Sequence, residues 1–295
     1  MTLLPPRFDY ASPDSLDDAL SLLEQHGNDA KVLAGGQSLI PLLKLRFASP
    51  ALLVDVNRIA GLDGIQEASG QLRIGALARH ASVASSETLK ARYPILTTTA
   101  PLIADPITRG RGTMGGSLAH ADPAGDWGSV MLALGASVVA RSATAERTIA
   151  ISDFFRGPFR SALMPNEMVT EIRIPSGGAH VGGTYLKLER KVGDFATVGV
   201  AVVLDLSDGG IDRAGIGLTA VGSRNLQATA AQESLVGVSP SPEAFDAAAA
   251  LAAEASDPSS DVRGSAEYKR AVVRAFVRRG LDRALEIAQA GRVAA

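Results

Sequence analysis

The segment LAGGQSLI, residues 33–40, decides the fold class, because it joins a short apolar strand to a turn with no side chains at its centre. Its members are Leu33, Ala34, Gly35, Gly36, Gln37, Ser38, Leu39 and Ile40. Two adjacent glycines let a ligand approach backbone N–H donors closely, and the side chains of Gln37 and Ser38 add further donors. The segment predicts a cradle for a diphosphate, with an ordinary tight turn as the alternative.

A second glycine pair lies in a segment that is rich in hydroxyls and carboxylates. The residues with binding chemistry there are Thr113, Met114, Gly115, Gly116, Ser117, His120, Asp122 and Asp126. Two such segments predict one extended dinucleotide, with Thr113 and Ser117 at phosphate or adenosine oxygens and Asp126 at ribose hydroxyls. Neither segment matches Gly-x-Gly-x-x-Gly or the Walker A pattern, so we expect neither a Rossmann nor a P-loop fold.

Hydrophobic periodicity and glycine breaks divide the chain into three expected units, residues 1–57, 58–176 and 177–295. The first should contain a helix that is capped near Ser15 and stops at Gly27, and then strands over 31–34 and 52–56. The second should contain a strand over 72–75, helices after 80 and over 93–103, a buried helix leading into a strand over 130–139, and a strand over 171–175.

The third expected unit follows Ser176-Gly177-Gly178 and combines a small antiparallel sheet with helices. Its expected elements are strands over 184–189, 198–206 and 216–221, the last two joined by a turn around Asp208-Gly209-Gly210, and helices over 245–255 and 268–287. The chain as a whole is therefore expected to be α+β. Basic residues of the last helix, Lys269 among them, are expected on a solvated face.

The charge balance and the lack of cysteine exclude several classes of function. The formal net charge is -2, so no global positive field attracts nucleic acid. With no cysteine, the chain cannot form disulfides or hold a cysteine-ligated iron-sulfur cluster, and any such cluster must belong to another chain. Without a secretory signal or a long apolar run, we expect a cytoplasmic location, with contact to the inner face of the membrane only through a complex.

Several polar residues have plain structural explanations. His120 and Asp122 lack the further histidines or cysteines that a metal site needs, so no metal is predicted. Neither Ser38 nor Ser117 lies in a nucleophile-elbow sequence, which argues against a hydrolase. Trp127 is expected to pack in a core. The histidines expected to face solvent at turns or helix ends are His26, His80 and His180.

Four motifs together resemble the FAD-binding medium subunit of the carbon monoxide dehydrogenase and xanthine dehydrogenase family, over the whole chain. They are AGGQSL at 34–39, RGTMGGS at 111–117, AHADP at 119–123, and KLERKVGDFA at 187–196, and they follow the order of the family. The resemblance implies a p-cresol-methylhydroxylase-like FAD fold of two subdomains. It also implies a C-terminal flavoprotein domain with a three-stranded antiparallel sheet and a helical bundle.

The same resemblance assigns residues to parts of the cofactor. It places 33–40 and 113–117 around the FAD diphosphate and Asp126 towards the adenosine end. Lys187 becomes a candidate contact near the flavin, although an alternating strand would otherwise put it at the surface. Three further flavin contacts are implied, namely Ile103, Val169 and Phe195, the last at a position where some relatives have tyrosine.

The function implied by the resemblance is electron transfer by a noncovalently bound FAD. Electrons would come from an iron-sulfur small subunit, substrate hydroxylation would occur in a molybdenum-cofactor large subunit, and quinone, oxygen or NAD would be the external acceptor. A dimer of heterotrimers is the expected assembly. No residue is assigned as an acid or base, because the cofactor performs the redox step. A free-standing flavin oxidoreductase and a noncatalytic assembly subunit are the alternatives.

Overall fold

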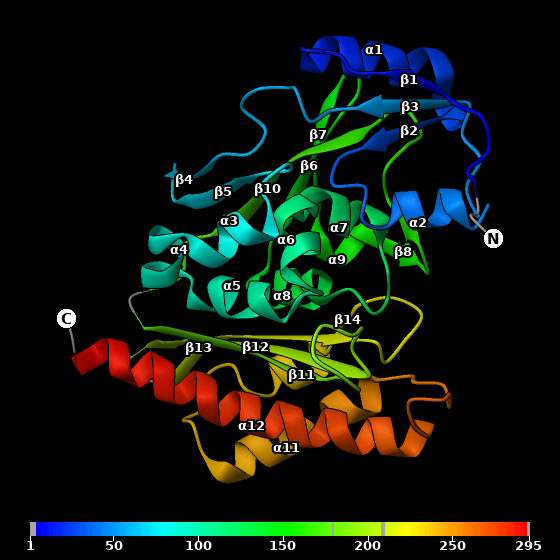
Figure 1. The fold of residues 1–295 in the computed structure, drawn as a ribbon. Helices are drawn as coiled ribbons and strands as arrows, with labels where there is room; N and C mark the ends of the chain where they lie inside the picture. The colour runs from blue at the N-terminus through cyan, green and yellow to red at the C-terminus, as the bar shows by residue number, and fades with distance from the viewer. Residues whose placement is uncertain (1–3, 179, 208–209, 294–295) are drawn as a thin grey trace.

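Three sheets, each built from a different stretch of sequence, organise the chain (Figure 1). The computed structural model describes residues 4–178, 180–207 and 210–293. In Figure 1 the sheets and their helices follow one another from the blue N-terminal part to the red C-terminal helix. None of the helices in these described ranges combines the length and the apolar character needed to cross a bilayer.

The first sheet has three parallel strands in the order β1-β3-β2 and is covered by one helix. The Ser15 hydroxyl caps that helix by accepting the Asp18 N–H at 3.1 Å, and Gly27 ends it at a φ of 50°. The predicted helix and both predicted strands are thereby confirmed. The elements are β1 (Asp9–Ala11), α1 (Leu16–His26), η1 (Gly27–Asp29), β2 (Ala30–Leu33), α2 (Leu39–Lys44) and β3 (Leu52–Asp55).

The second sheet is antiparallel, with five strands in the order β4-β5-β10-β6-β7. Its strands are β4 (Ile65–Ala68), β5 (Gln71–Gly75), β6 (Ser137–Arg141), β7 (Glu146–Ala150) and β10 (Met168–Pro175). Seven short helices and one 3-10 turn lie between or beside these strands: α3 (His80–Ser85), α4 (Glu87–Arg92), α5 (Pro94–Thr99), η2 (Ala100–Leu102), α6 (Pro106–Arg111), α7 (Met114–His120), α8 (Asp126–Leu134) and α9 (Ile151–Phe154). A small separate hairpin joins β8 (Phe155–Gly157) to β9 (Arg160–Ser161).

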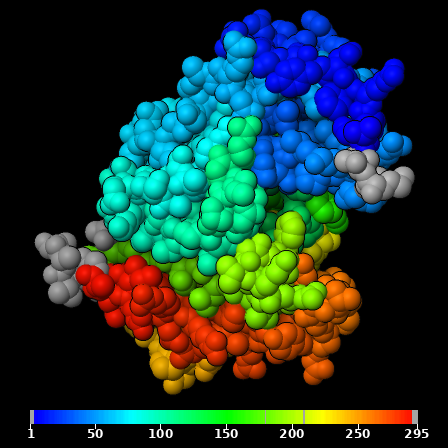
Figure 2. All heavy atoms as spheres, in the orientation of Figure 1, coloured from blue at the N-terminus to red at the C-terminus, as the bar shows by residue number. Residues whose placement is uncertain are grey.

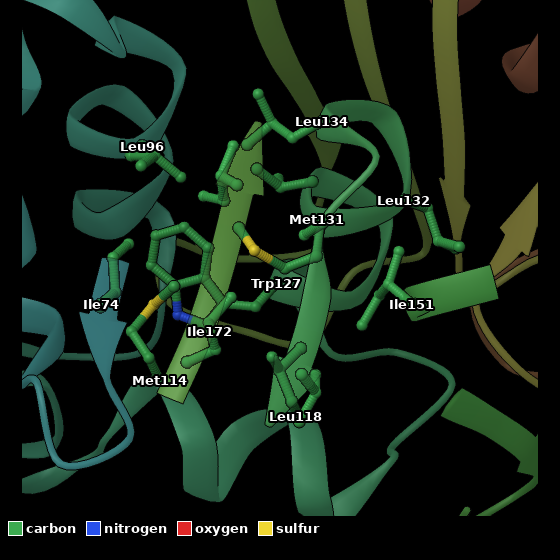
Figure 3. Packing of buried hydrophobic residues seen from close by; sticks show 14 of the residues in the cluster. Ile74, Leu96, Met114, Leu118, Trp127, Met131, Leu132, Leu134, Ile151 and Ile172 are labelled. Atoms are coloured by element: carbon green, nitrogen blue, oxygen red, sulfur yellow. The ribbon is translucent and has the colours of Figure 1, made fainter. Parts of the chain in front are cut away.

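The largest core lies between the second sheet and its helices. Trp127 is completely buried there, and Figure 3 shows its indole ring among Ile74, Met114 and Ile172. Helix α8 carries Trp127, and all nine of its residues are buried. The expectation of core packing for Trp127 is therefore confirmed, and a helix buried on every side explains why 130–139 is so continuously apolar.

The third sheet is antiparallel and has four strands in the order β11-β12-β13-β14. The prediction of three strands missed β14, because a strand of two residues leaves no hydrophobic period in the sequence. Asp208 and Gly209 of the predicted turn lie outside the described residues. The elements are β11 (Val181–Leu188), β12 (Val198–Ser207), β13 (Gly210–Thr219), β14 (Leu226–Gln227), α10 (Thr229–Glu233), α11 (Pro242–Ala255) and α12 (Ala266–Val293).

The third sheet is a middle layer, with α12 on one face and α8 on the other (Figure 1). Alternate residues of β12 go to different cores: Val200 and Val202 pack with the C-terminal helices, while Ala201 joins the core around Trp127. Glycines make both contacts close. A β-carbon on Gly182 would lie 2.6 Å from the Ala288 nitrogen of α12.

Lys269 is buried, so the prediction of a solvated position for it is wrong. Its side chain is 4% exposed, and Nζ lies 2.8 Å from Asp261 Oδ2 and donates to the Ser259 carbonyl at 2.9 Å. Arg270, Arg274 and Arg279 of the same helix are exposed as expected. The difference arises because α12 enters beside the 256–265 loop, which folds over its first turn and supplies the carboxylate that a buried ammonium needs.

Substitution of Gly217 should loosen the contact between α8 and the third sheet. A β-carbon there would lie 2.7 Å from the Ser129 carbonyl carbon, so Gly217→Ala forces the two layers apart. We expect a loss of about 1–3 kcal/mol in the free energy of unfolding, measured in urea. Gly64→Ala is the control, because a β-carbon at Gly64 meets no atom within 4 Å. Equal stability of the two variants would contradict this packing.

Candidate functional site

The first glycine segment forms a loop between β2 and α2 with unused backbone donors. Gly36 has a φ of +72°, a conformation that favours glycine. Within the described part of the chain, the N–H groups of Gly36, Gln37 and Ser38 donate no hydrogen bond to protein. Consecutive free amides in a turn form a concave anion site, so this loop fits a diphosphate. The Gln37 side chain donates to the Gly35 carbonyl at 2.9 Å instead of adding a donor to the site.

The second glycine pair is not an open loop, because it lies in the first turn of α7. The Gly115 N–H donates to the Ala76 carbonyl at 2.9 Å, and the Gly116 N–H donates to the Thr113 hydroxyl oxygen at 3.1 Å. The prediction that this pair contributes backbone donors is therefore wrong. Gly115 has a packing role, since a β-carbon there would lie 2.6 Å from the Ala76 β-carbon.

The fold nevertheless brings the two predicted segments into direct contact. A β-carbon on Gly35 would lie 2.7 Å from the Gly112 Cα atom, and one on Gly116 would lie 3.8 Å from the Ala34 β-carbon. In Figure 2 the blue residues of the first part border the cyan-green residues that contain α6. Thr113 and Ser117 thus lie in a segment that touches the first loop, although the Thr113 side chain is buried and its hydroxyl oxygen caps α7.

Asp126 and Lys187 form a buried ion pair between α8 and β11. Lys187 Nζ lies 3.2 Å from Asp126 Oδ2 and 3.3 Å from Glu189 Oε2, and the lysine side chain is 2% exposed. Tyr185 donates its hydroxyl proton to Asp126 Oδ1 at 2.6 Å. Burial raises the pKa of Asp126, although Lys187 and Tyr185 act in the opposite direction. Burial beside Asp126 also raises the pKa of Tyr185 well above its ordinary value.

This ion pair conflicts with the expected division of the cofactor. Asp126 was expected towards the adenosine end and Lys187 near the flavin, but atoms 3.2 Å apart cannot serve opposite ends of an extended dinucleotide. Lys187 also donates to the carbonyl of Leu102 at 2.9 Å, next to Ile103, which is another expected flavin contact. The two assignments are therefore inconsistent with each other for one extended dinucleotide, and the part of FAD that this cluster faces stays a prediction.

The other expected flavin contacts differ in exposure. Ile103 is half-buried, and Arg109 Nη1 donates to its carbonyl at 2.9 Å. Phe195 is 54% exposed, on a loop that Arg263 ties down by donating to its carbonyl at 3.3 Å. Figure 2 shows this loop in yellow-green, projecting from the surface beside orange residues. Val169 is 5% exposed and packs in the core around Trp127, so its contact with a flavin stays a prediction.

His120 and Asp122 lie at the end of α7 in different local roles. The His120 ring packs 5.1 Å from the Phe159 ring, and burial lowers the pKa of His120. Asp122 Oδ1 accepts the Ala124 N–H at 2.9 Å and so shapes the turn before α8. Among the residues that the structure describes, no group of three or more histidines and carboxylates could hold a metal ion.

Two residues that join the glycine segments were missed in the sequence. Asn57 Nδ2 donates to the Ala34 carbonyl at 2.8 Å, and Arg79 Nη2 donates to Asn57 Oδ1 at 2.5 Å. Arg79 also donates to the Arg111 carbonyl. The position of Asn57 directly after a buried strand was the one local signal, since polar residues at strand ends often line sites. Arg79 carried no local signal.

His80 is a buried neutral residue, and the prediction that it faces solvent is wrong. It is 5% exposed, its Nδ1 accepts the Trp127 indole N–H at 3.1 Å, and its backbone N–H donates to the Gly112 carbonyl at 3.1 Å. Burial, with the nearby cations Arg79 and Arg109, lowers the pKa of His80 to about 4. His80 thus supports the second segment from behind.

His80 should make the protein less stable in mild acid. The unfolded chain binds a proton on this residue near pH 6.5 and the folded chain only near pH 4, so the stability due to neutral His80 is lost as the pH falls between these values. We expect His80→Gln to remove about 2 kcal/mol of the loss in unfolding free energy between pH 7 and pH 5. Urea unfolding at both pH values measures this. His26→Gln, at an exposed position, is the control for the replacement of a histidine.

Removal of Lys187 should destabilise the chain strongly. Lys187→Met leaves Asp126 and Glu189 close together in a buried place without their cation, at an expected cost of about 3–5 kcal/mol in unfolding free energy. Lys191→Met, at an exposed position in the loop after β11, is the matched control and should change stability little. If denaturant unfolding gave the same unfolding free energy for both variants, the ion pair would not stabilise the fold.

Comparison with known proteins gives matches over nearly the whole chain. Residues 6–177 match the family described as the FAD binding domain in molybdopterin dehydrogenase, and residues 183–284 match the CO dehydrogenase flavoprotein C-terminal domain. The carbon monoxide dehydrogenase medium chain of Hydrogenophaga pseudoflava is 42% identical over 282 residues, which are 96% of this chain and 98% of that one. Subunit alpha of the 6-hydroxypseudooxynicotine dehydrogenase complex of Paenarthrobacter nicotinovorans is 41% identical, with 97% of each chain covered.

Solved structures agree with the sequence matches. Carbon monoxide dehydrogenase from Hydrogenophaga pseudoflava aligns with a TM-score of 0.93 and 43% identity, over 96% of this chain and 99% of that chain. Quinoline 2-oxidoreductase from Pseudomonas putida 86 aligns with a TM-score of 0.88 and 33% identity, over 97% and 99%. The predicted α+β fold class and FAD as the cofactor are confirmed. The chain belongs to the family of FAD-binding medium subunits of the carbon monoxide dehydrogenase and xanthine dehydrogenase class of molybdenum hydroxylases.

Proposed function

We propose that this chain is the electron-transfer subunit of a molybdenum-containing hydroxylase, and that it holds the diphosphate of FAD on its first glycine loop. The observation that carries the proposal is the run of unpartnered amides from Gly36 to Ser38, in a loop that touches the segment containing Thr113 and Ser117. A diphosphate is the part of FAD that needs several hydrogen-bond donors at one place. The match to whole medium chains supports the same conclusion.

The protein residues bind and orient, and FAD supplies the one-electron and two-electron chemistry. Lys187 places a positive charge beside Asp126 and holds the Leu102 carbonyl, which fixes the backbone next to Ile103. The aromatic ring of Phe195 lies exposed on the neighbouring loop, where it can pack against a ring but cannot donate a hydroxyl proton. No side chain here is required to act as an acid or base.

Partner chains complete the proposed reaction. The chain has no cysteine, so an iron-sulfur cluster that delivers electrons belongs to a small subunit, and the molybdenum cofactor belongs to a large one. We propose a dimer of these heterotrimers, with quinone, oxygen or NAD as the external acceptor. Relatives named as subunits or medium chains support an assembly of several chains. We place the boundaries of this chain's own units at 1–57, 58–176 and 177–295, near the division between the two family matches.

Replacement of Gly36 tests the function in the intact complex. Gly36→Val puts a branched side chain at a φ of +72° and distorts the free amides, so we expect FAD to be lost while molybdenum and iron contents stay unchanged. Gly237→Val is the control, because Gly237 has a similar φ of +77° and open space around it. Metal analysis of the purified complex gives its molybdenum and iron contents, and flavin absorbance gives its FAD content.

Two results would contradict the proposal. Full flavin content in the Gly36→Val complex would remove the loop from the FAD site. A wild-type protein that purifies alone, without chains that carry molybdenum and iron, would favour a free-standing flavin oxidoreductase instead.

A further inference from the structure

We propose that Asn57 and Arg79 are positioning residues that clamp the two glycine segments together and so set the geometry of the diphosphate donors. This inference rests on the proposed function, because it assigns these residues a role toward FAD. Neither residue lies in the glycine motifs. Asn57 bonds to the first segment, Arg79 bonds to the second, and the two side chains bond to each other.

Asn57 holds the first segment from the end of β3. Its Nδ2 donates to the Ala34 carbonyl at 2.8 Å and to Asp55 Oδ1 at 2.6 Å. Asp55 also accepts the Asn57 backbone N–H at 2.9 Å, and the Tyr10 hydroxyl donates to Asp55 Oδ2 at 2.7 Å. The amide of Asn57 is thus fixed in orientation by a chain of hydrogen bonds, with its oxygen left for a donor from elsewhere.

Arg79 is that donor, and it also holds the second segment. One guanidinium nitrogen donates to Asn57 Oδ1 at 2.5 Å, and the other donates to the Arg111 carbonyl. Residue 79 forms a backbone bridge with Thr113 as well, so side chain and main chain anchor the same segment. A guanidinium suits this place because its planar fork reaches two acceptors at fixed directions, which an ammonium does not.

The charge of Arg79 adds to the case for an anion at the contact. The residue is half-buried, and both of its acceptors are neutral oxygens. No carboxylate of the described residues lies within ion-pair distance of its guanidinium. Arg79 reaches the backbone at Arg111, which Gly35 contacts, so its positive charge lies beside the first loop and favours a negative ligand there, although the carboxylates of Asp55 and Asp63 offset part of that charge.

The clamp controls a close backbone contact between the two glycine segments. Gly35 meets the backbone of Arg111 and Gly112 so closely that a β-carbon would lie 2.7 Å from the Gly112 Cα atom. Arg79 and Asn57 bond to the residues on either side of this point, Ala34 in one segment and Arg111 in the other. A shift of either segment would change the distance between the amides of the first and the hydroxyls of the second.

The test is a titration of the flavin-free full chain with FAD, in which binding is measured by the quenching of flavin fluorescence. We expect Arg79→Gln to raise the dissociation constant for FAD at least about tenfold, the usual effect of losing a hydrogen bond to a charged group. Asn57→Ala should have a similar effect. Because the two residues act as one unit, the double variant should bind FAD no more weakly than the weaker single variant.

Controls separate a positioning role from a general loss of structure. Arg147 of the second sheet also joins distant parts of the chain, with a bond to the Ala162 carbonyl and a salt bridge to Glu167, so Arg147→Gln should leave FAD binding within about twofold. The urea midpoint of flavin-free Arg79→Gln should match that of Arg147→Gln. If Arg79→Gln does not fold, Arg79→Lys replaces it. This variant keeps the positive charge but loses the planar guanidinium, and it should still weaken FAD binding severalfold.

Three outcomes would overturn the clamp. They are unchanged FAD affinity in the Arg79 variants, strictly additive effects in the double variant, and a loss of affinity that follows the loss of stability in every variant including Arg147→Gln. If the wild-type chain itself fails to quench flavin fluorescence, the proposed function is at fault and not the clamp.

Discussion

The backbone contact between Gly35 and the Arg111–Gly112 segment is the constraint on which the site depends. No side chain fits at residue 35, because a β-carbon would lie 2.7 Å from the Gly112 Cα atom. The contact joins the loop after β2 of the parallel sheet to the end of α6, just before α7 begins. The loop with free amides touches the segment that contains Thr113 and Ser117 at this point.

The four-stranded sheet has an equally direct influence on the site. Its glycines let α8 approach β13, and the same approach brings Asp126 at the start of α8 to Tyr185 and Lys187 of β11. A carboxylate and an ammonium buried together need each other, because either one alone would be costly in that environment. The C-terminal part of the chain therefore supplies the charge that completes the interior of the FAD-binding part.

Local sequence patterns predicted a feature correctly where residues close together in the chain determine it. The capped helix from Leu16 to His26, the buried strands and the paired glycines were all readable, since capping, periodicity and missing side chains are properties of neighbours in the chain. They failed where a distant partner decides. His80 is buried by Trp127, Lys269 is buried by the 256–265 loop, and the Gly115 amide is occupied by the Ala76 carbonyl.

By itself, the sequence determined the α+β class, the two glycine segments that we propose for the FAD site, and the need for a partner to hold any iron-sulfur cluster, because no cysteine is present. Only the tertiary structure decided which amides stay free, that Asp126 pairs with Lys187, and that Asn57 and Arg79 join the two segments. The reason is physical. A hydrogen bond depends on the direction and distance of two groups, and for residues far apart in the chain the packing of the layers sets both.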